Sequence, residues 1–377
     1  IRRDHDVVGV SQHDNAVTVD TPGRHQLTAR YVVGCDGAHS RVRELTGISF
    51  PGNSYPEVNR LGQVTVPDSV TRLDNGDLDV PGLGTIHAGF TRTDRGTFAV
   101  GSLSTGMLLV QTMEDESVEY DPDEPLTLAE LGDSIRRVLG VELPLGEPIR
   151  LSRYQFQARQ AQRYRDGRIM VAGDAAHQFP STGIGLNAGM LDSVNLAWKL
   201  AAHIQGRAPA GLLDTYHDER HLANARALLH SQAQVALRRG TDPAADALRE
   251  IFRELLADEQ PVRRIAALIA GTDIRYPSPT SHDALTGTFA PDLVLHTDAG
   301  TTSVAALLRT PRPVFLDLAD RSDLRAIAEE HHVDIQTAKT DDRPADALLI
   351  RPDAHIAWAA GADDHTTLRA ALDRWFG

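Results

Sequence analysis

The feature that most constrains the fold is a short apolar run that leads directly into a glycine-rich segment. Residues 169–172 follow Arg168 as Ile-Met-Val-Ala, which is the pattern of a buried strand in a parallel sheet. Residues 173–189 continue as Gly-Asp-Ala-Ala-His-Gln-Phe-Pro-Ser-Thr-Gly-Ile-Gly-Leu-Asn-Ala-Gly, and a long helical pattern follows. Open α/β sheets bind ligands at the carboxyl ends of such strands. The ordered package therefore predicts a ligand site and not merely a flexible loop.

The residue types in this segment indicate what it binds. The Asp174 carboxylate can accept hydrogen bonds from ligand hydroxyls. Gly183, Gly185 and the start of the following helix would present backbone N–H groups and a positive helix dipole. Such a helix end suits a ring oxygen that gains negative charge when the ring is reduced.

A second segment, residues 31–43, reads Tyr-Val-Val-Gly-Cys-Asp-Gly-Ala-His-Ser-Arg-Val-Arg. An apolar strand runs into Asp36 and Gly37, and Ser40 is placed to cap a helix that carries two arginines in its first turn. The glycines would let the backbone approach a ligand closely. Taken alone, the segment is equally consistent with a plain strand–turn–helix and a surface arginine pair.

The remaining chain divides into recognisable elements. Residues 7–10 and 16–19 predict a hairpin around Asp14-Asn15, and residues 190–204 place apolar side chains at helical spacing, which predicts an amphipathic helix. Further expected strands are 27–33, 151–157, 313–318, 346–350 and 355–359, with mostly β-structure over 60–120; expected helices are 40–45, 127–139, 323–331 and 366–375, with almost continuous helix over 211–270. Clustered Pro, Ser, Thr and Gly over 276–291 predict a domain boundary.

Charge and cysteine content exclude several classes of function. The net charge is −14, from 38 basic and 52 acidic residues, so a nucleic-acid partner is not expected. No run approaches the roughly 18 apolar residues that would span a bilayer. Cys35 is the only cysteine, which fits a reducing cytoplasm and excludes a cysteine-rich metal site. His217 and His221 have the spacing of a zinc helix, but Asp218 replaces the required glutamate, so we interpret them as a polar helix face.

Together the two segments resemble the Asp-Gly and Gly-Asp fingerprints of the group A FAD-dependent aromatic monooxygenases, which share the para-hydroxybenzoate hydroxylase fold. Residues 213–220 (Leu-Asp-Thr-Tyr-His-Asp-Glu-Arg) are similar to the segment that follows the flavin helix of that family. Residues 287–292 resemble the start of the thioredoxin-like domain of its larger members. Those members include polyketide hydroxylases, phenol hydroxylase and rifampicin monooxygenase.

The resemblance implies an α/β fold with three parts. These are a Rossmann-like FAD-binding domain of the GR2 type over 1–50 and 151–275, a β-sheet substrate domain over 51–150, and a thioredoxin-like α/β domain over 284–377. The family's opening G-x-G-x-x-G unit, which holds the FAD diphosphate, does not precede Asp36, so we expect the chain to be N-terminally incomplete. The last domain has no cysteine, which excludes thiol exchange there and favours a structural or homodimer-contact role.

The resemblance also implies which residues meet the cofactor. Asp174 would bind the FAD ribityl chain, residues 183–187 would lie against the pyrimidine edge of the flavin, and Pro180 near its reacting face. The Asp36 and Arg41/Arg43 region would support FAD and the NAD(P)H pathway. The cofactor-binding residues expected on this basis are Gly173, Asp174, Pro180, Gly183, Ile184, Gly185, Leu186, Asn187, Asp36, Gly37 and Arg41.

The activity implied is hydroxylation of a phenolic or polycyclic aromatic substrate with NAD(P)H and O2 through a flavin C4a-hydroperoxide. The sequence does not identify the residue that acts as acid or base on the substrate. His87 and Arg92 are candidates, but a structural role is the simpler interpretation of each. Alternatives that stay open are oxidative inactivation of an antibiotic of the rifampicin type, a Baeyer–Villiger reaction, and a flavin-binding scaffold without turnover.

Overall fold

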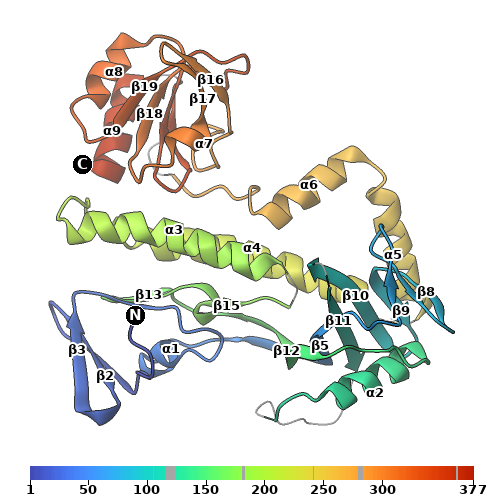
Figure 1. Cartoon of the computed structure of the whole chain (residues 1–377). Coiled ribbons are helices and arrows are strands. Elements are labelled where there is room, and N and C mark those ends of the chain that lie inside the picture. The colour runs from blue at the N-terminus through green and yellow to red at the C-terminus, as the bar shows by residue number, and fades with distance from the viewer. Residues whose placement is uncertain (105, 116–123, 181–182, 241, 279–282, 362–363) are drawn as a thin grey trace. The chain divides into compact units, whose positions relative to one another are not determined.

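The computed structural model describes the 377-residue chain except residues 105, 116–123, 181–182, 241, 279–282 and 362–363. The described residues form two compact units, and each is considered by itself. The first comprises Ile1–Pro51, Arg159–Arg239 and Ala244–Gly377, and the second comprises Gly52–Ala158 with Gly240–Pro243. Figure 1 labels the elements of both units.

The first unit opens with an antiparallel three-stranded sheet of β1 (Gly9–Gln12), β2 (Val17–Thr21) and β3 (His25–Ala29). The expected hairpin between β1 and β2 is confirmed. The single strand expected over 27–33 is wrong, because the chain leaves this sheet after β3. It continues as β4 (Val32–Gly34), which belongs to another sheet. An apolar pattern does not reveal such a change of partner strand.

The sheet that matters for the site has the order β13-β14-β4. Here β14 (Ile169–Val171) runs parallel to β4 and antiparallel to β13 (Arg165–Asp166), with Val171 opposite Gly34. All three residues of β14 are buried, as the apolar run predicted. Tyr216 fixes the end of the strand, since its hydroxyl donates to the Val171 carbonyl oxygen at 2.8 Å.

Helices dominate the rest of this unit before the C-terminal sheet. Ser40 caps α1 as expected, and the helical stretch expected over 211–270 divides into three helices. The bounds are α1 (Arg41–Leu45), α3 (Ile184–Ile204), α4 (Thr215–Arg238), α5 (Pro243–Leu255) and α6 (Glu259–Ala270), with 3-10 turns at Pro22–Arg24 and Gly173–Ala175. In Figure 1, α3 and α4 run side by side.

Helix α3 does not bury the face that its apolar spacing predicts. Met190 and Val194 are 50% and 48% exposed, whereas Asp192, Asn195 and Lys199 are at most 1% exposed. The prediction of an apolar inner face is therefore wrong for much of this helix. The physical reason is that its polar side chains find charged partners on neighbouring elements, which offsets the cost of burying them.

The C-terminal part of the unit is an α/β fold around the sheet β19-β18-β20-β21. The expected strands and helices of this region are confirmed, while β16, β17, β19 and α7 are additional. The bounds are β16 (Val294–Thr297), β17 (Gly300–Ser303), α7 (Val304–Leu307), β18 (Val314–Asp317), α8 (Ser322–Ala328), β19 (Asp334–Thr337), β20 (Ala347–Ile350), β21 (Ile356–Ala359) and α9 (Asp364–Phe376). The thioredoxin-like relationship stays a prediction.

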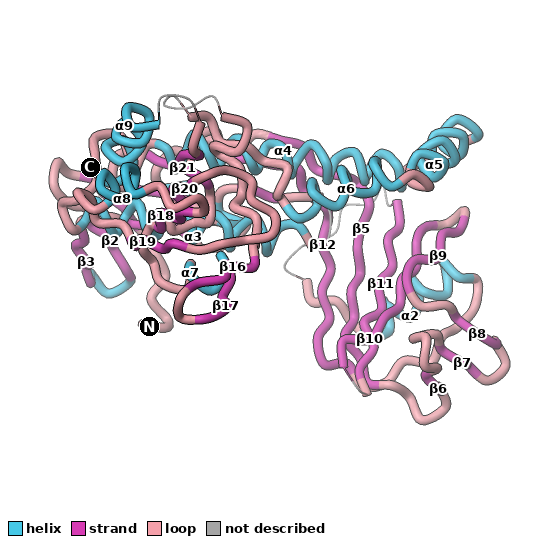
Figure 2. The backbone as a smooth tube through the Cα atoms, turned by 90° about the horizontal axis from the view of Figure 1, so that it is seen from above, coloured by secondary structure: helices cyan, strands magenta, loops and turns pink. Residues whose placement is uncertain are grey.

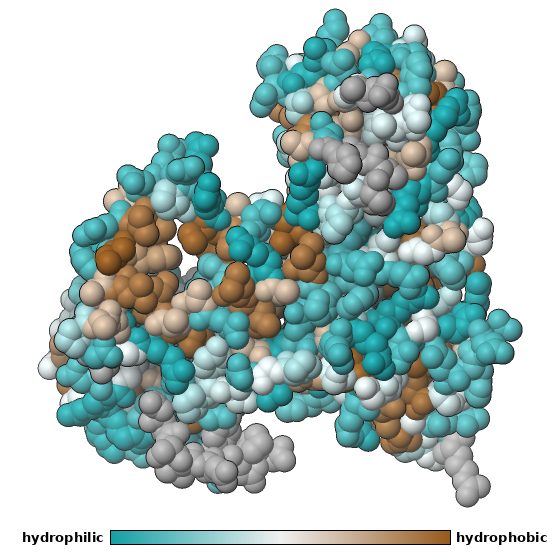
Figure 3. All heavy atoms as spheres, turned by 180° about the vertical axis from the view of Figure 1, so that it is seen from behind, coloured by the Kyte–Doolittle hydropathy of each residue, from teal (hydrophilic) through white to brown (hydrophobic). Residues whose placement is uncertain are grey.

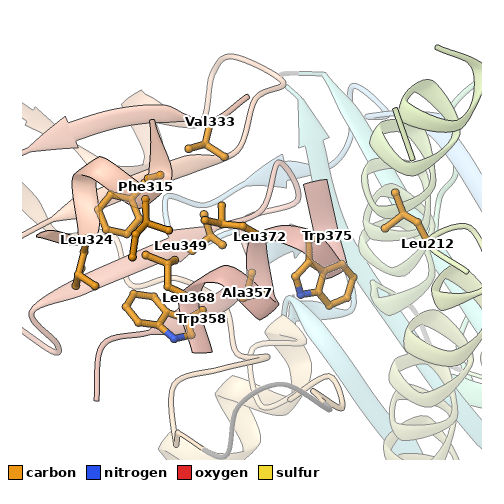
Figure 4. Packing of buried hydrophobic residues seen from close by; sticks show 14 of the residues in the cluster. Leu212, Phe315, Leu324, Val333, Leu349, Ala357, Trp358, Leu368, Leu372 and Trp375 are labelled. Atoms are coloured by element: carbon orange, nitrogen blue, oxygen red, sulfur yellow. The ribbon is translucent and has the colours of Figure 1, made fainter. Parts of the chain in front are cut away.

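One apolar core joins this sheet to the helices that precede it. Phe315, Leu349 and Trp358 pack between the sheet and α8 and α9 (Figure 4). Trp198 of α3 and Leu212 belong to the same cluster of buried side chains. The C-terminal α/β fold is therefore packed directly onto α3 and onto the segment that leads into α4.

A buried ionic cluster reinforces this contact. Arg351 donates to both carboxylate oxygens of Glu219, at 2.6 and 2.8 Å, and also to Asp353. Lys199 donates to Glu219 at 2.6 Å, and Asn195 donates to Glu219 and Asp353 at 2.7 and 2.9 Å. Each charge thus has an opposite partner within hydrogen-bonding distance, as burial requires.

The second unit is built on long antiparallel strands, which Figure 2 shows side by side. β12, β5, β11, β10 and β9 are neighbours in that order, and α2 packs on one face. The bounds are β5 (Gly52–Thr65), β6 (Thr71–Arg72), β7 (Leu78–Val80), β8 (Gly84–Ile86), β9 (Gly89–Thr93), β10 (Gly96–Ser104), β11 (Met107–Asp115), α2 (Leu128–Leu139) and β12 (Pro148–Gln160). The expected β-rich region and helix are confirmed over the described residues; 116–123 lie outside them.

Helices α5 and α6 keep apolar side chains at the surface. Leu248, Ile251 and Leu255 of α5 are 50–56% exposed, and Val262 and Ile269 of α6 are 44% and 46% exposed. Figure 3 shows apolar residues gathered in patches on the face that it presents. Over the described part of the chain, no helix is both long enough and apolar enough to cross a membrane.

The ionic cluster makes a stability prediction. Burial alone raises the pKa of Glu219, but the charges of Arg351 and Lys199 outweigh this effect and lower it to about 2, from an ordinary 4.5. Glu219→Gln leaves these cations short of a counter-charge, so the free energy of unfolding at pH 7 should fall by about 3 kcal/mol in urea titrations.

The same substitution should change the pH dependence. A carboxyl group whose pKa is lower in the folded than in the unfolded protein stabilises the fold fully at any pH above its unfolded-state pKa. This stabilisation is lost as the pH falls toward the folded-state pKa, here about 2. The wild type should therefore lose stability between about pH 4.5 and 2 more steeply than Glu219→Gln. Glu259→Gln, which breaks a pair that is over three-quarters exposed, is the control and should cost under about 1 kcal/mol. Equal losses in the two variants would contradict the assignment.

Candidate functional site

The two motifs predicted from sequence meet at one edge of the β13-β14-β4 sheet. The Ala172 N–H donates to the Gly34 carbonyl oxygen at 3.0 Å, which extends the β14–β4 pairing to the strand ends. Since the strands are parallel, the loop containing Asp36 and the loop containing Asp174 leave the sheet at its carboxyl edge. The structure thus places both sequence motifs at the position where an open α/β sheet binds ligands.

The Asp36 side chain is used within its own loop. Its carboxylate accepts from the Ser40 hydroxyl at 2.5 Å and from the Val42 N–H at 3.0 Å. The Ser40 hydroxyl in turn accepts from the Arg43 N–H at 3.0 Å, and so caps α1. Gly37 has a φ of 84°, a conformation that favours glycine in this tight turn. Asp36 therefore shapes the backbone of the loop.

Arg43, and not Arg41, connects the two motifs. Its guanidinium donates to the Ala38 carbonyl oxygen at 2.9 Å and to the Ala175 carbonyl oxygen at 2.8 Å. It also lies over the Phe50 ring, 3.8 Å from the centroid. Arg41 is exposed and pairs with Glu44. The sequence alone does not distinguish the roles of these two arginines. Their roles differ because only Arg43 reaches the loop that contains Ala175.

Asp174 is the open acidic group of the site. The residue is exposed, and within the described chain its carboxylate has no hydrogen-bond partner. It lies in the 3-10 turn that begins at Gly173, whose φ of 62° is one that L side chains rarely adopt. A Cβ on Gly189 would lie 3.3 Å from the Gly173 Cα, so α3 passes close to this turn. The carboxylate is free to accept hydrogen bonds from a ligand.

Helix α3 begins beside this turn. Gly183 is its N-cap, with a φ of 97°, and the first turn contains no acidic residue. Ile184 is buried, whereas Leu186 and Asn187 are exposed, and the space that a Cβ on Gly183 would enter is open. The free N–H groups and the positive end of the dipole are therefore accessible to an electron-rich ligand. Ser181 and Thr182, which precede Gly183, lie outside the described residues.

Pro180 is held at a defined place before this helix. It is buried, and its carbonyl oxygen accepts from Arg238 of α4 at 3.1 Å. The adjacent Phe179 ring lies 4.7 Å from the His177 ring, centroid to centroid. These contacts fix the segment that leads from the Asp174 turn toward Gly183.

A buried carboxylate, Asp192, lies behind the Asp174 turn and was not identified from sequence. One oxygen accepts from the Gly173 N–H at 3.0 Å and from His177 Nε2 at 2.8 Å. The other accepts from Arg220 Nε at 2.8 Å and Asn224 Nδ2 at 2.9 Å. Burial alone raises the pKa of Asp192, but the His177 hydrogen bond and the Arg220 charge outweigh it, so the pKa lies below its ordinary value. Asp192 is therefore an anion, and Nε2 of His177 is the donor.

Other candidate residues have structural partners. His87 contacts Asp77 at 2.9 Å, and Arg92 donates to the Gly240 carbonyl oxygen. His217 and His221 both pack their rings against Tyr164. Throughout the described residues, no group of three or more metal-ligating side chains is placed to hold an ion. We interpreted His217 and His221 as part of a polar helix face. The structure corrects this in one respect, because their contacts with Tyr164 leave both side chains half-buried.

The chemistry of these groups fits FAD. Asp174 offers an unpaired carboxylate for hydroxyl groups, and the start of α3 offers N–H donors and positive potential for carbonyl oxygens of a ring. Positive-φ glycines keep side chains away from both loops. The residues that would hold the ribityl and ring portions of a flavin are therefore present on one edge of the sheet.

Two family models match the chain. The FAD-binding domain matches residues 1–231, and the C-terminal domain of aromatic-ring hydroxylases matches residues 283–377. Residues 232–282 lie between the two matched regions.

Individual proteins extend the match over the full chain. Rifampicin monooxygenase of Streptomyces venezuelae is 35% identical and dialkyldecalin synthase of Streptomyces rugosporus is 37% identical; each match covers 100% of this chain and 75% of the relative. The structure of the anhydrotetracycline hydroxylase OxyS from Streptomyces rimosus has a TM-score of 0.86 at 35% identity, covering 100% of this chain and 76% of that one.

The chain belongs to the FAD-dependent aromatic-ring hydroxylase family, the flavin monooxygenase group that its two motifs resemble. The predicted family, α/β fold and FAD cofactor are thereby confirmed.

The two arginines of α1 offer a matched comparison. Arg43→Met removes the guanidinium that bridges the loops and leaves the Ala38 and Ala175 carbonyl oxygens without a donor, so the free energy of unfolding should fall by about 2 kcal/mol. Arg41→Met removes only an exposed pair and should cost under about 0.5 kcal/mol. Urea unfolding of both variants measures the difference. Equal effects would show that Arg43 does not connect the loops.

Proposed function

We propose that the chain hydroxylates a fused-ring aromatic substrate with FAD, O2 and NAD(P)H. The observation that carries the proposal is the pairing of β4 with β14, which brings the two family motifs to one edge and leaves Asp174 and the start of α3 open to a cofactor. Relatives named for rifampicin and anhydrotetracycline support a large aromatic substrate.

Within this proposal each loop residue has a role. Asp174 accepts hydrogen bonds from the ribityl hydroxyls, and the N–H groups at residues 184–186 donate to the flavin pyrimidine edge. Gly173, Gly183 and Gly185 allow close approach, Leu186 and Asn187 line the exposed side, and Pro180 lies near the reacting face. Asp36 and Gly37 shape the neighbouring loop, with Arg41 on its outer side. The bound flavin supplies the redox and oxygen chemistry.

The second unit offers a surface for the substrate. Its α2-facing side is filled, whereas the opposite side of β5 and β11 carries half-buried Leu61, Leu109 and Met113 together with the amides of Asn59 and Gln111. Apolar side chains would contact an aromatic ring system, and the amides would bind its oxygen substituents. We propose that these five residues contact the aromatic ring system of the substrate and its oxygen substituents.

Asn59 is the most specific of these groups. It is fully buried, and its Oδ1 accepts from Gln111 Nε2 at 2.9 Å. This bond assigns the amide orientation, so that Nδ2 points elsewhere as a donor. Nδ2 has no hydrogen-bond partner among the described residues. A buried donor without a partner is costly unless a ligand satisfies it, and we propose that a carbonyl or phenolic oxygen of the substrate does so when binding moves the residues that cover Nδ2.

A substitution tests this role. Asn59→Leu should raise KM for the aromatic substrate about tenfold, the cost of one lost hydrogen bond, while NAD(P)H oxidation without substrate stays unchanged. Thr112→Val is the control, because Thr112 lies on the α2 side of the sheet and bonds Ser134 at 2.7 Å. That variant should lose stability and keep its KM. An unchanged KM in Asn59→Leu would remove Asn59 from the substrate surface.

The experiment that tests the function uses the full-length protein and its visible absorption spectrum. Flavin bands should bleach on addition of NADPH, and the bleaching should accelerate with one member of a panel of fused-ring phenols, with O2 uptake and a hydroxylated product. Asp174→Ala should bind FAD at least about tenfold more weakly, since it loses charge-assisted hydrogen bonds. Absence of flavin bands after reconstitution with FAD would overturn the proposal.

A second candidate is favoured by one relative. Dialkyldecalin synthase, at 37% identity over the whole chain, carries a name for ring formation and not for oxygen insertion. In that case the chain would bind FAD and shape a substrate without consuming NAD(P)H. Tight FAD binding with no NAD(P)H oxidation and no O2 uptake across the substrate panel would favour this candidate over hydroxylation.

A further inference from the structure

The hydrogen bonds behind the Asp174 turn form one connected buried unit, which we call the Asp192 cluster: Asp192, His177, Arg220 and Asn224. Asp192 and His177 are 0% exposed, and Arg220 and Asn224 are 3% and 1% exposed. Burying two formal charges is costly and is tolerated only where the partners are well placed. The cluster therefore holds a defined geometry.

The cluster ends on the backbone of the residue 173–177 turn, which contains Asp174. The Asp192 carboxylate accepts a hydrogen bond from the N–H of Gly173, and Gly173 immediately precedes Asp174. His177, which donates to the same Asp192 oxygen, lies at the other end of the same turn. Asp192 thus holds both sides of the turn that presents the Asp174 carboxylate.

Arg220 extends the unit toward the C-terminal fold. Its NH1 donates to the Tyr276 hydroxyl at 2.9 Å. Burial raises the pKa of Tyr276 to about 12, so the phenol stays neutral and can accept this bond. The Tyr276 ring stacks on His355, with centroids 4.2 Å apart and an interplanar angle of 19°. Arg220 is therefore fixed by both helices and by the C-terminal sheet region.

We propose that Asp192, oriented by His177 and Arg220, is a positioning residue for FAD: it fixes the Gly173 N–H and thereby the turn that places Asp174 against the cofactor. The proposal rests on the proposed flavin role of Asp174. Preorganisation of this kind lowers the ordering cost of binding, so that its loss appears as weaker FAD affinity.

The neighbouring ionic cluster supplies a matched control. Glu219 is adjacent to Arg220 on α4, is equally buried, and also bonds an arginine and an α3 residue. Its partners are Asn195, Lys199 and Arg351, and its bonds do not include the residue 173–177 turn. Asp192→Asn and Glu219→Gln therefore both replace a buried carboxylate with an amide. Only Asp192 bonds the residue 173–177 turn.

The test measures FAD dissociation constants of the full-length apoprotein by flavin fluorescence, together with amide hydrogen exchange of the 172–178 region. Asp192→Asn should weaken FAD binding at least tenfold and speed exchange in that region. Glu219→Gln should lose stability yet keep the dissociation constant within about twofold. His177→Ala should weaken binding and His177→Gln should restore most of it, because the Gln Nε2 can donate as the imidazole Nε2 does.

The outcomes separate the two proposals. If the wild type binds no FAD, the proposed function fails. If the wild type binds FAD and Asp192→Asn binds it equally well, or if Asp192→Asn and Glu219→Gln weaken binding equally, the positioning role is overturned. Should Asp192→Asn fail to fold, the His177 pair decides: equal affinity of His177→Ala and wild type would overturn the proposal.

Discussion

The parallel pairing of β4 with β14 is the contact on which the rest of the site depends. It joins segments that are far apart in the sequence and sets Gly34 opposite Val171, so that both motif loops leave the same edge of the sheet. Arg43 then ties the loops together through backbone carbonyl oxygens. Both segments are therefore available to a cofactor that binds at this edge.

Buried polar groups take part, together with apolar ones, in orienting α3. The helix turns Asp192, Asn195 and Lys199 inward and leaves several apolar side chains outside. Two clusters result, one around Asp192 and one around Glu219, and adjacent α4 residues serve both. Directional hydrogen bonds therefore hold the middle of α3, in addition to its apolar packing.

Much of the site could be predicted from sequence, because its motifs are local. The buried strand, the Asp174 turn, the capping Ser40 and the long helix each leave a pattern within a few residues. The roles of Arg43 and Asp192 could not be predicted, since both depend on which backbone lies opposite. The split of residues 27–33 into β3 and β4 was missed for a similar reason: an apolar pattern indicates a strand but not the sheet that it joins.

The proposed roles of Asp174, of the start of α3 and of Asp192 all depend on how FAD lies against the carboxyl edge of β4 and β14. A structure of the full-length protein with FAD measures it most directly. We expect a ribityl hydroxyl bonded to Asp174, the flavin pyrimidine edge at the first turn of α3, and Asp192 still bonded to the Gly173 N–H. A flavin bound away from the carboxyl edge of β4 and β14, with Asp174 facing solvent, would contradict it.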